Sequence, residues 1–184
     1  MTKGIIISVL VVFATAAWGT DPAVASARAD NTGDQPSLCQ SDEQMKSFFS
    51  TAEVLNEQER GYIEYDDGYR YNRQPEGSLW HWIMVRFIVD ELEGAYTVSW
   101  EGYTDARDDF AMKAYAWDWT MAQFNLKDGT APTGIWNTAR TFTVGEKYWE
   151  KDDTTGDYAC VILVEGRTED YLRGLHIDVV RQGY

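Results

Sequence analysis

Aromatic side chains at a two-residue spacing are the feature of this sequence best suited to chemistry. Trp80 and Trp82 lie two positions apart, and Tyr69 and Tyr71 repeat that spacing upstream. Residues two apart on a strand share a face of the sheet, and an aromatic ring offers a flat apolar face that matches the C–H face of a sugar. We therefore expect these four residues to form an exposed platform that binds a glycan. The alternative is that they fill the core, as most aromatic rings of a β-sandwich do.

Carboxylates are the second group that could do chemistry. The segment 152–157 reads Asp-Asp-Thr-Thr-Gly-Asp, which has the composition of a calcium loop, although it lacks the ligand spacing and final glutamate of an EF-hand. The alternative is that these side chains hydrogen-bond their own turns. The aspartates in expected loops are Asp66, Asp67, Asp105, Asp108, Asp109, Asp152, Asp153 and Asp157.

A catalytic arrangement is hard to find in this sequence. Glycoside hydrolysis needs two carboxyl groups on either side of the scissile bond, and Glu101 and Glu165 lie in expected strands that could face a groove. The sequence has no nucleophile elbow, no HExxH motif and no glycine-rich phosphate loop. We therefore expect no catalytic residues and keep a small hydrolase as an alternative.

Cys39 and Cys160 are the two cysteines of the chain. An exported protein with two cysteines usually joins them, so we predict a disulfide between them, with two free thiols as the alternative. A catalytic thiol is not expected, because His81 and His176, the two histidines, lie in no recognisable motif.

The N-terminus predicts export. Lys3 precedes an apolar stretch at 5–18, and Ala25-Ser26-Ala27 follows as a small-residue cleavage motif. We expect residues 1–27 to be a signal peptide, with cleavage after Ala27 or after Ala29, and the protein to be secreted and extracellular. A membrane anchor is the alternative, but the apolar stretch is shorter than the about 20 residues that a spanning helix needs.

The formal net charge of −14 limits the partners of the chain. A protein this acidic repels nucleic acid and anionic membranes at long range. We expect no nucleic-acid partner and no membrane insertion.

Beyond the signal peptide we expect an N-terminal arm at 28–54 and a β-sandwich domain at 55–184. Ser41 resembles a helix start and is followed at helical spacing by Met45, Phe48 and Phe49. The arm therefore contains either a short helix or an extended lead-in.

From residue 61 onward the apolar period is two, with turn signals about every ten residues. This pattern predicts an all-β, antiparallel sandwich of eight or nine strands. In segment 80–90 one face holds His81, Ile83, Val85, Phe87 and Val89, which we expect to face the core. The other expected strands are 62–65, 69–71, 95–103, 110–119, 122–126, 139–144, 158–165 and 175–181.

Several short motifs resemble one family. They are Trp117-Asp118-Trp119 followed by Phe124, the closing segment Leu175-His176-Ile177-Asp178-Val179-Val180, and Asp66-Asp67-Gly68. On these residues the stretch 55–181 resembles secreted jelly-roll modules of the galactose-binding-like and carbohydrate-binding kind. The resemblance implies a jelly-roll fold and a polysaccharide or surface glycan as partner.

The resemblance also implies a structural calcium ion where the last strand meets the first. Asp178 occupies the matching position, and Glu64 or Asp66 could reach it.

Together these features predict a secreted, non-catalytic protein that binds a polysaccharide or surface glycan. One alternative is a structural or adhesive extracellular subunit that self-assembles by strand exchange, which would make the protein a homo-oligomer. The second alternative is the small secreted hydrolase.

Overall fold

The computed structural model describes residues 23–30, 34–64, 71–73, 80–92, 94–104, 112–129, 140–167 and 172–181. Of these, only the backbone is described for 23–25, 30, 61–64, 71–73, 81, 101–104, 167 and 172–181.

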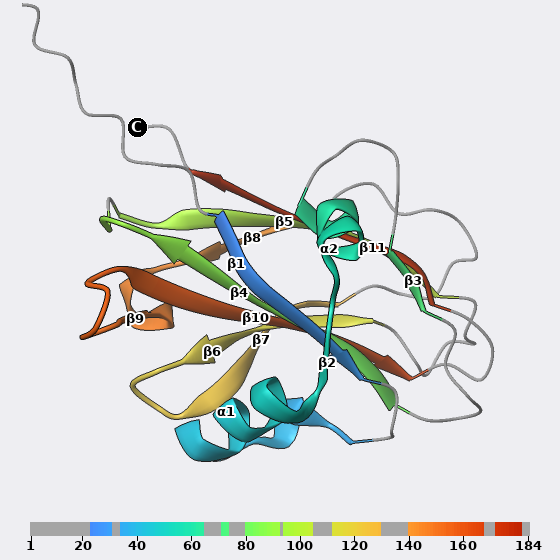
Figure 1. Cartoon of the computed structure of the whole chain (residues 1–184), viewed down its shortest axis with the longest axis horizontal. Coiled ribbons are helices and arrows are strands. Elements are labelled where there is room, and N and C mark those ends of the chain that lie inside the picture. Colours follow the sequence, from blue (N-terminus) through green and yellow to red (C-terminus); the bar gives the residue numbers. More distant parts are fainter. Residues whose placement is uncertain are drawn as a thin grey trace, which may run out of the picture.

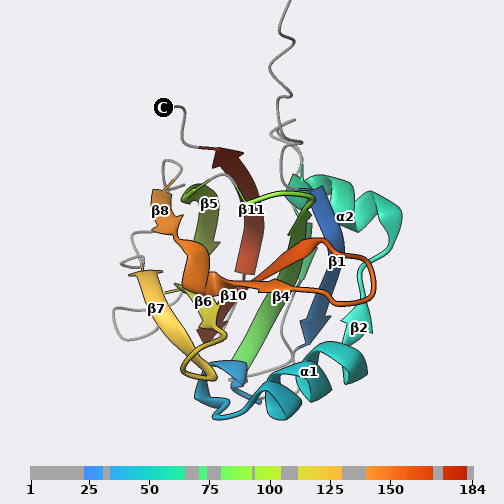
Figure 2. The same cartoon turned by 90° about the vertical axis from the view of Figure 1, so that its left-hand side faces the viewer.

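Two antiparallel sheets form the body of the protein (Figures 1 and 2). Sheet A has seven strands, and six of them follow the order β2 (Glu53–Val54), β1 (Ala23–Asp30), β4 (Trp80–Val89), β10 (Tyr158–Arg167), β6 (Lys113–Asp118) and β7 (Gln123–Gly129). The seventh, β9 (Trp149–Lys151), pairs with β10. Sheet B has the order β3 (Tyr71–Arg73), β11 (Leu172–Arg181), β5 (Tyr96–Thr104) and β8 (Arg140–Val144).

The strand order is that of a jelly roll. Eight strands can be numbered one to eight in chain order; they are β3, β4, β5, β6, β7, β8, β10 and β11. In this numbering the order of sheet B is 1-8-3-6, and the order of the four strands β4, β10, β6 and β7 of sheet A is 2-7-4-5. Two Greek keys wound in this way define the architecture. The predicted antiparallel jelly-roll-like sandwich is confirmed. Within the described part of the chain β1, β2 and β9 are additional strands that the period-two pattern did not reveal.

The main core lies between the two sheets. Ile83, Val85, Phe87 and Val89 of β4 are buried there, which confirms the predicted core face for these four residues. The side chain of His81, the fifth residue of that face, lies outside the described residues. Sheet B contributes Tyr96, Val98 and Trp100 from β5. Alternate residues of each strand therefore fill the space between the sheets, as the pleat requires.

An ion pair joins the two sheets at the β7–β8 edge. Asp128 of β7 accepts hydrogen bonds from Arg140 Nε and Nη2, both at 2.5 Å, and from Trp100 Nε1 at 3.0 Å. Burial raises the pKa of Asp128, but the hydrogen bonds from Arg140 outweigh that effect and hold the pKa below its ordinary value. The bidentate pair fixes sheet A against sheet B where no strand pairing connects them.

The outer face of sheet A is apolar as well. Trp82, Met84, Trp117 and Leu163 lie on it and are all buried. Residues 34–52, which we call the N-terminal cover, lie across this face and contain the 3-10 turn η1 (Pro36–Leu38) and the helix α1 (Asp42–Thr51). Figures 1 and 2 show α1 lying across one end of sheet A.

The helix α1 begins where the sequence predicts a helix. Ser41 Oγ accepts a hydrogen bond from Gln44 N at 3.3 Å, and Gln44 Oε1 accepts one from Gln40 N at 2.8 Å. The first contact satisfies a backbone donor that the first helical turn leaves unpaired, and the second ties the residue before the N-cap to that turn. Met45 is buried against the sheet, and the Phe48 ring meets Trp82 edge-on at 6.1 Å between centroids.

The predicted strand at 62–65 is wrong. Residues Glu57–Glu64 form the helix α2, which contacts β1, β3 and β11. A capping box starts it, because Asn56 Oδ1 accepts from Glu59 N at 3.0 Å while Glu59 Oε2 accepts from Asn56 N at 2.8 Å. None of the helices in the described ranges is long and apolar enough to cross a membrane.

The predicted disulfide is also wrong. Cys160 lies in the core between the sheets, whereas Cys39 belongs to the cluster on the outer face of sheet A, and both are free thiols. Because successive side chains of a strand point to opposite faces, sheet A separates the two sulfur atoms. The spacing of two cysteines along a chain carries no information about the face on which each one lies.

The predicted cleavage points fall inside β1. Ala27 pairs with Val85, and Ala27 and Ala29 are 1% and 0% exposed. Cleavage after Ala27 would leave only Arg28, Ala29 and Asp30 of this strand.

A chain that starts at Arg28 should be less stable than one that starts at Asp21. The shorter chain loses the pairing of Ala23–Ala27 with β4 and the burial of Ala27. We expect the midpoint of thermal unfolding to fall by about 5 °C or more, as measured by circular dichroism. Equal midpoints for the two chains would show that β1 adds nothing to the fold.

Both cysteines should react as free thiols once the protein is unfolded. Burial and the nearby charge of Glu165 raise the pKa of Cys39 to about 11, and burial also raises the pKa of Cys160. Thiolates are the reactive form, so a thiol reagent should modify the native protein slowly and the unfolded, unreduced protein at both cysteines. A reduced sample is the control. If the unfolded protein reacts with the reagent only after reduction, the two cysteines form a disulfide and the prediction of free thiols is wrong.

Candidate ligand-binding site

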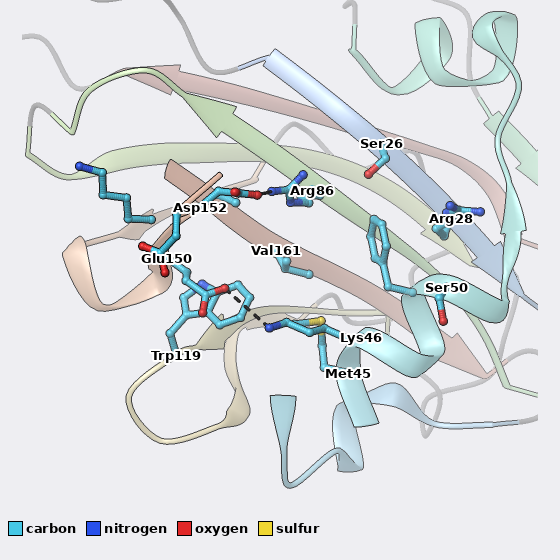
Figure 3. A pocket seen from close by; sticks show the side chains of 14 residues that line it. Ser26, Arg28, Met45, Lys46, Ser50, Arg86, Trp119, Glu150, Asp152 and Val161 are labelled. Atoms are coloured by element: carbon cyan, nitrogen blue, oxygen red, sulfur yellow. Dashed lines mark ion pairs between the residues drawn. The ribbon is translucent and has the colours of Figure 1, made fainter. Parts of the chain in front are cut away.

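A pocket of about 540 Å³ lies on the part of the outer face of sheet A that the N-terminal cover leaves open. Its floor comes from β1, β4 and β10, and its sides come from α1, β9 and the turn after β6 (Figure 3). The pocket therefore exists because α1 covers only part of the outer face of sheet A.

The apolar part of the pocket is built around Trp119. Its ring is half-buried, Nε1 donates to the Tyr148 carbonyl oxygen at 3.2 Å, and the ring packs edge-on against Trp117 at 6.3 Å between centroids. Phe49 from α1 and Val161 from β10 extend the apolar lining. The indole ring is thus held in one orientation before any ligand arrives.

Asp118 fixes the turn that carries Trp119. Its buried carboxylate accepts from Thr120 N and Met121 N, each at 3.1 Å, and from Lys147 Nζ at 2.6 Å. Burial raises the pKa of Asp118, but the hydrogen bonds from Lys147 and the turn amides outweigh it, so the pKa lies below its ordinary value. A charged, fully partnered carboxylate makes this turn rigid.

Charged side chains surround the apolar part. Lys46 Nζ lies 4.0 Å from Glu150 and 5.6 Å from the centre of the Trp119 ring, and Arg86 lies 3.5 Å from Asp152. These side chains are between 34% and 58% exposed, and exposed ion pairs contribute only about 0–1 kcal/mol. A ligand can therefore displace them at little cost.

The acidic loop at 152–157 forms a turn. Asp152 Oδ1 accepts from Thr154 N at 2.8 Å and from Thr155 N at 3.2 Å, and Gly156 has a positive φ of 82°. These backbone donors hold the pKa of Asp152 below its ordinary value. Among the described side chains no group of three metal-binding residues comes together.

The predicted calcium site at Glu64, Asp66 and Asp178 stays a prediction. Glu64 ends α2, and Asp178 lies opposite Ser99 in the β11–β5 pair. The side chains of Glu64 and Asp178 lie outside the described residues, and so does the whole of Asp66.

The predicted four-residue aromatic platform is wrong as a unit. Trp82 is only 2% exposed, because the N-terminal cover lies over it, so it cannot present its ring to a glycan. Tyr71 lies in β3 of sheet B, whereas Trp80 and Trp82 lie in β4 of sheet A. Trp80 is half-buried, Tyr69 lies outside the described residues, and only the backbone of Tyr71 is described. The strands β3 and β4 follow each other in the sequence, but the chain crosses from sheet B to sheet A between them, so their side chains do not share a face.

The hydrolase alternative requires Glu165 to face a groove, and it does not. It is 2% exposed, and Ser37 of the N-terminal cover donates to it through Oγ at 2.5 Å and through its backbone N–H at 3.3 Å. Burial raises the pKa of Glu165 above its ordinary value even though Ser37 stabilises the charged form. The side chain of Glu101 lies outside the described residues.

Sequence reasoning did not select Trp119, Arg28 or Arg86 as site residues. Trp119 has a local signal, because Asp118 before Thr120 and Met121 is typical of a turn that would expose the intervening ring. The two arginines have no such signal, since only the sheet and α1 together place them at the pocket.

No protein-family model matches the chain, and no curated protein matches it. Among solved structures it is similar to TmCBM61, a carbohydrate-binding module, in complex with beta-1,4-galactotriose, at 14% identity over 61% of this chain and 71% of that chain, with a TM-score of 0.33. A similarity this low carries no functional argument. The strand order by itself places the chain among jelly-roll β-sandwiches, the architecture that the resemblance implies.

Replacing Glu165 by Gln should change how stability depends on pH. The pKa of Glu165 is raised in the folded state, so the stability it contributes is fully present below its ordinary value of 4.5 and is lost as pH rises through the raised value. Relative to the parent protein, Glu165→Gln should therefore gain stability as the pH rises above 4.5. Denaturant unfolding at several pH values measures this difference, and Glu146→Gln, at an exposed site, is the control. If the free energies of unfolding of Glu165→Gln and the parent differ by the same amount at every pH, the pKa of Glu165 is not raised in the folded protein.

Proposed function

We propose that this chain is a non-catalytic protein that binds a polysaccharide or surface glycan in the pocket beside α1. The observation that carries the proposal is a half-exposed indole ring, held rigidly by Asp118 and Tyr148, at the side of a pocket whose rim is polar.

The size and composition of the pocket support a sugar ligand. Small-molecule sites usually span about 300–1,000 Å³, and this pocket has about 540 Å³. A sugar ring has apolar C–H faces and a polar edge. Trp119 supplies the apolar surface, and Ser26, Ser50 and Asp153 supply groups that can exchange hydrogen bonds with hydroxyls.

Lys46 is the side chain that a ligand has to move. Its ammonium group lies over the Trp119 ring, an exposed cation–π contact worth about 0.5–1 kcal/mol. A sugar ring stacked on the indole replaces that contact with a larger apolar one. Lys46 therefore covers the ring in the free protein without blocking it.

Two expectations of the sequence, export and a structural calcium ion, belong to the proposal, whereas cleavage after Ala27 or Ala29 does not, because Ser26 and Arg28 line the pocket. The apolar N-terminal stretch supports a protein that works outside the cell, where polysaccharides and surface glycans are found. A structural calcium at Asp178 would stabilise the sandwich and would take no part in recognition.

Trp119→Ala should weaken glycan binding by about tenfold or more, which corresponds to about 1.4 kcal/mol of lost stacking. Glycan-array screening followed by calorimetry on the best ligand measures the effect. Trp80→Ala is the matched control, because it removes a half-buried indole from the far end of β4, outside the pocket.

The control should bind like the parent protein, and circular dichroism should show that both variants are folded. If Trp119→Ala binds glycan as tightly as the parent protein, the proposed site is wrong. Loss of binding in Trp80→Ala alone would move the site to the start of β4.

A further inference from the structure

One end of the pocket holds Arg28, an arginine that forms no ion pair with any described residue. Arg28 of β1 pairs in register with Met84 and lines the pocket. Its Nη1 donates to the Ala52 carbonyl oxygen at 3.4 Å, and its guanidinium carbon lies 5.7 Å from the centre of the Phe49 ring. Within the described part of the chain Arg28 forms no ion pair, and its buried Nε has no hydrogen-bond partner.

The other basic side chains of the pocket already have partners. Lys46 pairs with Glu150, Arg86 pairs with Asp152, and Lys151 Nζ lies 5.6 Å from the centre of the Tyr158 ring. Figure 3 shows Trp119 and the acidic groups at one end of the pocket and Arg28 with Ser50 at the other. Among the described residues that line the pocket, Arg28 is thus the cation best placed to meet an anionic group of a ligand.

The local charge of the pocket contrasts with that of the whole protein. Four basic and three acidic side chains line it, whereas the chain as a whole carries a net charge of −14. Long-range attraction cannot bring an anion here. An anionic group must therefore be recognised by direct contact, and a half-buried arginine supplies that contact in a medium that screens charge less than water does.

We propose that the ligand is an acidic polysaccharide built of uronic acid units, in which one carboxylate pairs with Arg28 while a neighbouring sugar ring stacks on Trp119. This inference rests on the proposed function and specifies its substrate class. A carboxylate matches the planar guanidinium with two parallel hydrogen bonds. A uronic acid unit carries that carboxylate on the same kind of ring that Trp119 is placed to receive.

The test compares each acidic polysaccharide with its own carboxyl-reduced form, so that only the carboxylate differs. The probes are polygalacturonate, alginate and a glucuronate polymer, each with its reduced partner, and a sulfated galactan as a second kind of anion. Calorimetry on the purified protein gives the ratio of the two affinities in each pair. The variants are Arg28→Gln, Arg28→Lys, Trp119→Ala and, as a charge-matched control outside the pocket, Lys113→Gln, which is exposed on β6.

We expect the parent protein to bind at least one acidic polymer about tenfold or more tightly than its reduced form. Arg28→Gln should reduce that ratio to near one, Arg28→Lys should keep part of it, and Lys113→Gln should leave it unchanged.

Other results separate this inference from the proposed function. Equal binding of every acidic polymer and its reduced form, or a ratio that survives in Arg28→Gln, overturns the inference and leaves glycan binding intact. A preference for the sulfated galactan over all the uronates also overturns it. If no polysaccharide binds, or if Trp119→Ala binds as well as the parent, the proposed function itself fails.

Discussion

The structure depends on one constraint: the central strands of sheet A are apolar on both faces. In β4, Ile83, Val85 and Phe87 fill the space between the sheets while Trp82 and Met84 point the other way, and β10 repeats this arrangement. Burying a large apolar side chain contributes roughly 1.5–3 kcal/mol. The outer face of sheet A therefore needs a cover, and the N-terminal cover with α1 provides it.

The pocket is a consequence of that cover. The helix α1 is too short to span the whole outer face, so it buries the end that holds Trp82 and leaves a pocket at the end that holds Arg86. Its own side chains then become one wall of the pocket. Ser37 anchors the beginning of the cover through the buried carboxylate of Glu165. The pocket therefore forms only when the N-terminal cover packs on sheet A, and a substitution in the cover should alter both the stability of the fold and ligand binding.

Much of the fold could be predicted from local patterns, because those patterns report local physics. The alternation in segment 80–90 identified the core face of β4, and the capping residue Ser41 identified the start of α1. The errors have physical reasons too. Tyr62 and Ile63 suggested a strand, but the capping box of Asn56 and Glu59 began a helix first. The alanine-rich residues of β1 matched a cleavage motif, because small residues suit a peptidase site and a tightly packed strand equally well.

By itself the sequence determined the class of fold, the acidity of the surface and the local start of α1, since each follows from composition, period or capping within a few residues. Only the tertiary structure decided which aromatic rings are exposed and which charges meet. Trp82 and Trp119 look alike in the sequence, yet one lies beneath the N-terminal cover and the other lies at the pocket. Exposure depends on what packs against a face, and here the packing segment lies far away in the chain.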